Sequence, residues 1–133
     1  MALGNPYQTY QQNSVNTASP GELTLMLYDG CLKFLSQAKK AIDSGSIEKR
    51  NINIQKAQNI IQEFMVTLNM DVTVSKDLMS MYDYLYRRLV EANIHNNKEI
   101  VEEVEQFVRE LRDTWKQAIQ INRQKQHSSN GRI

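Results

Sequence analysis

Few residues in this 133-residue chain combine the type and the spacing that catalysis or metal binding requires. The closest approach is Glu91 with His95, because helical bundles that hold two iron ions use Glu-x-x-His on two helices together with further inward carboxylates. Glu91 and His95 are four residues apart, and no Glu-x-x-His occurs in the sequence. On a helical wheel both fall on the polar side of their segment. The pattern favours a solvent-facing pair, and we predict no metal site.

Two other groups of residues invite a chemical interpretation. Glu102, Glu103 and Glu105 lie close together, but they fall outside the apolar stripe of their segment, which predicts a solvated acidic face. Cys31 lies on an apolar stripe, where a cysteine usually packs as a small hydrophobic residue. A nucleophilic cysteine would need a basic, partly exposed setting and a histidine neighbour, and neither is visible around Cys31. There is no P-loop or dinucleotide fingerprint either, so we predict no enzyme and no cofactor.

The overall charge excludes several classes of partner. Lysine and arginine number 16 against 15 aspartates and glutamates, so the net charge of +1 gives no strong field toward nucleic acid or an anionic membrane. One cysteine excludes an internal disulfide. No apolar run approaches the roughly 18 residues of a membrane span, and the opening stretch lacks the basic and apolar regions of a secretory signal. We predict a cytoplasmic protein with no nucleic-acid binding and no membrane insertion.

The first of four predicted helices begins at Ser19. Ser19 can cap the helix while Glu22 reaches back, and Pro20 suits the first helical position. Apolar residues then recur at spacings of three and four as far as Gly45, which supplies a stop. Asp29-Gly30 is a competing pattern, because between two apolar runs it is typical of a type I′ hairpin turn. The unbroken spacing and the capping box favour the helix.

Three further segments show the same helical spacing of apolar residues. The second covers about residues 46–69 and the third about residues 75–93. The fourth opens at Asn96, with Glu99 as its capping partner, and continues to about residue 122.

These segments predict an all-α fold, an antiparallel up-down four-helix bundle with an N-terminal arm. Short connections between helices of matched length make consecutive helices antiparallel. The bundle domain is expected to cover residues 19–122. Residues 1–18 are expected to form the mobile arm, and the polar residues 123–133 a disordered tail.

Two of the predicted helices have wider apolar faces than one bundle interior uses. At 100° per residue the first spreads its apolar residues over about 200° and the third over about 180°, against about 120° for the fourth. Packing against a tilted neighbour, cover by the arm, self-association and partner binding all remain open explanations. From their wheel positions on the first and third helices, we predict that a partner contacts Leu25, Met26, Leu32, Met79, Tyr86 and Val90.

The first 21 residues contain no charge, although they are not apolar. Tyrosines in such a segment can bury a large ring while the hydroxyl stays in water. We expect Tyr7, Tyr10 and Val15 to rest on the surplus apolar surface as a displaceable cap. A disordered tail with no such role is the alternative.

Four stretches carry a resemblance to a known family. They are VNTASPGELTLMLYDGCLKFLSQAKKAI at residues 15–42, AQNIIQEFMVTLN at 57–69, LMSMYDYLYRRLVEAN at 78–93 and VEEVEQFVRELRDTW at 101–115. These stretches closely resemble the signature of the flagellar export chaperone FliS family. The resemblance covers nearly the whole chain, and its most specific part is TASPGELTLMLYDG.

The resemblance implies a cytoplasmic helical bundle that binds the C-terminal segment of newly made flagellin. Binding would prevent premature polymerisation and keep flagellin competent for the flagellar type III secretion system. The resemblance also implies an arm that moves aside for the client, delivery to the flagellar export gate, and links to flagellar regulatory proteins. The alternative that the residues leave open is a homodimeric helical adaptor or regulatory protein with no client-folding role.

Overall fold

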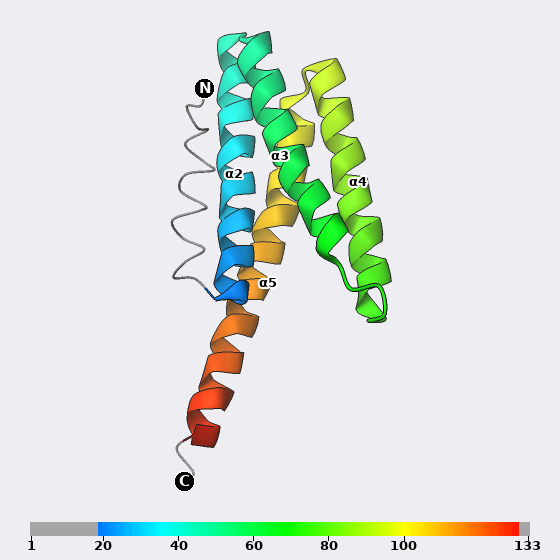
Figure 1. The fold of residues 1–133 in the computed structure, drawn as a ribbon. Coiled ribbons are helices and arrows are strands. Elements are labelled where there is room, and N and C mark those ends of the chain that lie inside the picture. Colours follow the sequence, from blue (N-terminus) through cyan, green and yellow to red (C-terminus); the bar gives the residue numbers. More distant parts are fainter. Residues whose placement is uncertain (1–18, 131–133) are drawn as a thin grey trace, which may run out of the picture.

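The computed structural model describes residues 19–130, with side chains as far as Lys125. It contains four helices: α2 (Pro20–Ser44), α3 (Ile47–Thr67), α4 (Val74–His95) and α5 (Lys98–Asn130) (Figure 1). Within the described residues there is no strand. The all-α prediction is confirmed.

The ends of α2 follow the local signals in the sequence. The Ser19 hydroxyl accepts a hydrogen bond of 3.2 Å from the backbone N–H of Glu22, and Pro20 opens the helix. The helix ends at Gly45, whose φ of 75° is the left-handed conformation that glycine adopts without strain. Between these ends α2 passes through Asp29-Gly30 without a break, so the hairpin alternative is wrong.

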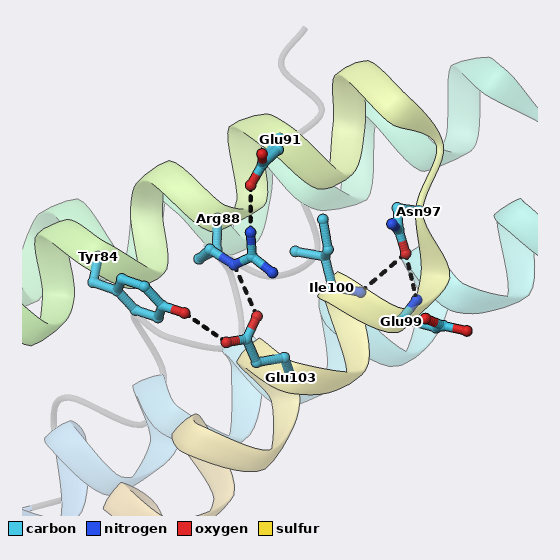
Figure 2. A network of polar contacts seen from close by, with 7 residues as sticks. All are labelled: Tyr84, Arg88, Glu91, Asn97, Glu99, Ile100 and Glu103. Atoms are coloured by element: carbon cyan, nitrogen blue, oxygen red, sulfur yellow. Dashed lines mark hydrogen bonds and ion pairs between the residues drawn. The ribbon is translucent and has the colours of Figure 1, made fainter.

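Helices α3 and α5 also begin at side-chain caps. The Ser46 hydroxyl accepts from the backbone N–H of Lys49 at 3.3 Å and starts α3. At the start of α5 the cap is Asn97, whose side-chain oxygen accepts from the backbone N–H groups of Glu99 and Ile100 at 2.9 and 3.2 Å (Figure 2). The predicted cap, Asn96, instead ends α4 with a φ of 51°.

The four helices form a closed ring around one core. Helix α2 packs against α3 and α5, and α4 packs against the same two helices. This is the up-down bundle that the sequence predicts, and it places α2 and α4 on opposite corners. The first and third predicted helices are therefore diagonal in the ring and are not neighbours along its outside. Fully buried core side chains include Leu35, Ile54, Ile61, Leu85, Leu89, Val101 and Val104.

Helix α5 is longer than its neighbours and extends past the end of the bundle (Figure 1). Its 33 residues reach Asn130, so residues 123–130 are helical where the sequence predicts a disordered tail. The reason is that no glycine or proline occurs from Lys98 to Asn130 to stop the helix. Arg123 also forms an ion pair with Glu22 of α2, which supports the extension next to the bundle.

An ion pair with a buried carboxylate joins α2 to α5. Lys39 donates to the carboxylate of Glu105 at 2.7 Å, and Glu105 is only 8% exposed. Arg109 lies 3.9 Å from the same carboxylate oxygen. The predicted solvated acidic face is therefore wrong for Glu105, because Lys39 of the adjacent helix neutralises it. Glu102 is exposed as expected.

Candidate functional site

The residues that could have carried chemistry are inert or solvated in the structure. Cys31 is fully buried, and burial raises the pKa of its thiol to about 12, so the reactive thiolate is disfavoured at neutral pH. Glu91 and His95 are both exposed, and Glu91 pairs with Arg88 of its own helix. Within the described side chains no group of three potential metal ligands is found. Over the same residues no helix is long and apolar enough to cross a membrane.

One recess is a cleft at the end of the bundle where α2 begins and where α3 connects to α4. Its volume is about 610 Å³. All four helices contribute to its lining, which consists of Thr24, Tyr28, Phe64, Thr67, Leu68, Leu78, Met81, Tyr82, Phe107, Glu110, Leu111, Thr114 and Trp115. Most of these side chains are apolar or aromatic and one is charged. Such a recess suits an apolar ligand with a few polar contacts.

Three aromatic rings form the floor of the cleft. Phe64 lies between the two tyrosines, tilted against Tyr28 with ring centroids 4.5 Å apart and stacked on Tyr82 with centroids 5.5 Å apart. The two tyrosine oxygens approach to 2.7 Å and share a hydrogen bond. Both tyrosines are nearly fully buried, and this burial raises the pKa of each hydroxyl above its ordinary value. The floor thus ties α2, α3 and α4 together at the otherwise open end.

One wall of the cleft is fixed by a contact between α5 and the start of α2. The indole N–H of Trp115 donates to the backbone oxygen of Gly21 at 2.9 Å. The Ile119 side chain of α5 also packs close to Gly21, where a Cβ would lie 3.3 Å from it. The point at which residues 1–18 join the bundle is therefore held next to the cleft.

A polar network fixes the seam between α4 and α5. The Glu103 carboxylate accepts from the Tyr84 hydroxyl at 2.6 Å and from the Arg88 guanidinium at 2.8 Å. Arg88 also pairs with Glu91 (Figure 2). The hydrogen bond from Tyr84, followed by that from Arg88, lowers the pKa of Glu103. Tyr84 also meets Phe107, a lining residue of the cleft, edge to face with centroids 6.2 Å apart. Through Tyr84, the network thus helps to hold Phe107 in its place in the cleft lining.

A second recess lies on the outside of the bundle between α3 and α4. This groove has a volume of about 500 Å³ and is lined by Gln62, Met65, Val66, Met79, Asp83 and Tyr86. The chain that follows α3 exposes further apolar side chains, among them Met70 and Val72. Methionine-rich surfaces of this kind adapt to the shape of a bound helix.

The structure places the predicted partner-binding residues at several separate positions. Met79 and Tyr86 line the groove together. Leu32 packs against the core, and Val90 is 40% exposed on α4. Leu25 and Met26 are partly exposed on α2. These last four residues line neither the cleft nor the groove. The predicted cap residues, Tyr7, Tyr10 and Val15, lie outside the described residues.

Sequence reasoning missed the cleft. Its lining residues, such as Phe64, Leu78 and Trp115, sit on the stripes that predict ordinary core. One signal was available: Tyr28 and Tyr82 lie on apolar faces although their hydroxyls need partners. A helical wheel gives the angle of a residue around its helix but does not show where the helices separate.

Comparison with known proteins identifies the family. The protein-family model described as flagellar protein FliS matches residues 3–122 of the chain. The chain is 57% identical over 131 residues to the flagellar secretion chaperone FliS of Bacillus subtilis (strain 168), covering 98% of each chain. It is 32% identical over 111 residues to the flagellar secretion chaperone FliS of Escherichia coli (strain K12), covering 81% of this chain and 82% of the relative.

A solved structure supports the fold. A crystal structure of a flagellar chaperone from bacteria superimposes with a TM-score of 0.71 at 20% identity, over 86% of this chain and 95% of that chain. The chain therefore belongs to the flagellar protein FliS family, and the role that this membership supports is that of a flagellar secretion chaperone.

Proposed function

We propose that this chain is a cytoplasmic chaperone that binds the C-terminal segment of flagellin, prevents its premature polymerisation and keeps it competent for export. The observation that carries the proposal is the pair of apolar recesses, the cleft and the groove, on a member of this family. Delivery of the complex to the export gate and contacts with flagellar regulatory proteins belong to the same proposal.

The shape of the two recesses suits a client that folds as it binds. Ordering a disordered segment costs a few kcal/mol, so a chaperone must offer extensive apolar contact in return. The cleft lies inside one end of the bundle, while the groove lies on its outside between α3 and α4. An amphipathic client helix can place its apolar face in a recess of either kind. A segment with more than one helix could occupy both.

The test is co-purification of the full-length chain with flagellin. We expect intact flagellin to bind and flagellin that lacks its C-terminal segment not to bind, with both compared at equal concentration. Size-exclusion chromatography of the free chain and of the mixture separates this proposal from the homodimeric adaptor. An obligate dimer that ignores the C-terminal segment would contradict the chaperone function.

We also propose that residues 1–18 act as the removable cap, with Tyr7, Tyr10 and Val15 as its contacts. The supporting observation is that Trp115, which lines the cleft, holds the start of α2 through Gly21, so this segment begins next to the cleft. Amide hydrogen exchange should be fast in residues 5–16 of the free chain compared with the helices, and faster still with the client bound. Exchange as slow as that of the helices would argue against a displaceable cap.

A further inference from the structure

The two tyrosine hydroxyls on the floor of the cleft have more hydrogen-bonding capacity than they use. The oxygens of Tyr28 and Tyr82 are 2.7 Å apart, so one hydroxyl donates and the other accepts. Each hydroxyl carries one hydrogen and two lone pairs. Whichever way the bond runs, the accepting hydroxyl keeps its own hydrogen, and the described residues supply no acceptor for it. One donor on the floor of the cleft is therefore spare.

The surroundings make this spare donor important when a ligand enters. Among the described lining residues, neither the threonine hydroxyls nor the Glu110 carboxylate is bonded to either tyrosine, and Thr24 and Thr67 donate instead to backbone carbonyls of their own helices. In the open cleft a water molecule can accept the spare hydrogen. A client side chain that fills the cleft displaces this water. A purely hydrocarbon side chain would then leave a buried donor without a partner, which is unfavourable.

We propose that the cleft selects a client helix whose inserted side chain carries a hydrogen-bond acceptor at its tip, and that the Tyr28–Tyr82 hydroxyl pair is the specificity determinant. This inference rests on the proposed function, because it names the client feature that the same cleft recognises. The backbone carbonyls of a helical client are already bonded within the helix, so the acceptor belongs to a side chain. Glutamine and asparagine combine an aliphatic stem with an amide oxygen and fit this description.

The test replaces a polar group by a hydrocarbon group, first in the client peptide and then in the cleft. Peptides of the flagellin C-terminal segment, each with one glutamine or asparagine replaced by methionine or leucine, are titrated calorimetrically against the full-length chain. At one position we expect binding to weaken about tenfold, the effect of one buried hydroxyl left unpaired. The double variant Tyr28→Phe with Tyr82→Phe has a hydrocarbon floor. It should bind the replaced peptide at least as tightly as the natural one.

A hydroxyl outside the cleft provides the control. Ser44→Ala removes a hydroxyl at the opposite end of α2, where it donates to the backbone oxygen of Ala41, and this variant should keep the preference of the wild-type chain. Suppose that the natural peptide binds, but every replacement changes the affinity equally for the wild-type chain and for the double variant. The inference is then overturned while the proposed function stands. If the double variant does not fold, the replaced peptides are compared on the wild-type chain alone. The inference is overturned if none of them binds more weakly than the natural peptide. If the natural peptide does not bind the wild-type chain, both the proposed function and this inference fail.

Discussion

Met79→Glu is expected to reduce binding of the flagellin C-terminal segment by about a hundredfold or more while the bundle stays folded. Met79 lines the groove together with Met65 and Val66, and it is only partly buried, so the free chain can hold a glutamate there in contact with water. A client helix packed into the groove would bury that carboxylate. Among the described lining residues there is no cation to pair with it, and the neighbouring Asp83 already holds Arg87 at 2.7 Å.

The matched control for Met79→Glu is Ile94→Glu on the same helix. Ile94 is 71% exposed and lines neither recess, so the same change of charge should leave client binding unaltered. Fluorescence anisotropy with a labelled client peptide measures affinity, and thermal unfolding followed by circular dichroism monitors the fold. Unchanged affinity for a folded Met79→Glu variant would remove the groove from the binding surface. Global unfolding would instead make Met79 a core residue.

Lys39→Met is expected to destabilise the fold by about 3 kcal/mol. The substitution leaves the buried Glu105 carboxylate without its partner at 2.7 Å, and Arg109 at 3.9 Å is too distant and too exposed to replace it. The double variant Lys39→Met with Glu105→Met should recover most of the loss, because the buried carboxylate is then gone together with its partner. Urea unfolding gives the free energy of unfolding of each variant.

An exposed ion pair between the same two helices is the control for Lys39. Lys98 of α5 lies 3.0 Å from Asp43 of α2, and both side chains are largely exposed. Lys98→Met should therefore shift the urea midpoint little. Equal losses for Lys39→Met and Lys98→Met would show that burial does not strengthen the Lys39–Glu105 pair.

Most of the fold could be predicted because its signals are local. Ser19 and Gly45 mark the ends of α2 by chemistry that involves only the nearest few residues. Asn96 and Asn97 are neighbours with the same capping side chain, so the predicted start of α5 was wrong by one residue. The end of α5 was missed for a related reason: polar composition suggested disorder, although nothing before Gly131 stops a helix.

The candidate site was less predictable because it depends on residues far apart in the sequence. Glu105 is buried through Lys39, 66 residues away, and its own helix gives no sign of this. The cleft is lined by residues of all four helices, and the angular positions of these residues on each helix do not reveal that they meet at one recess. The outer groove was partly anticipated, since Met79 and Tyr86 were selected as surplus apolar residues on the third predicted helix.

Trp115 gives the molecule a built-in optical reporter. It is the only tryptophan of the chain, it lines the cleft, and it is 37% exposed. Every change in tryptophan emission of the unlabelled protein therefore originates at this wall. A ligand that enters the cleft and excludes water from the indole would shift the emission to shorter wavelength, whereas a ligand confined to the groove between α3 and α4 would leave it unchanged. The two recesses can thus be followed separately in solution without attaching a dye.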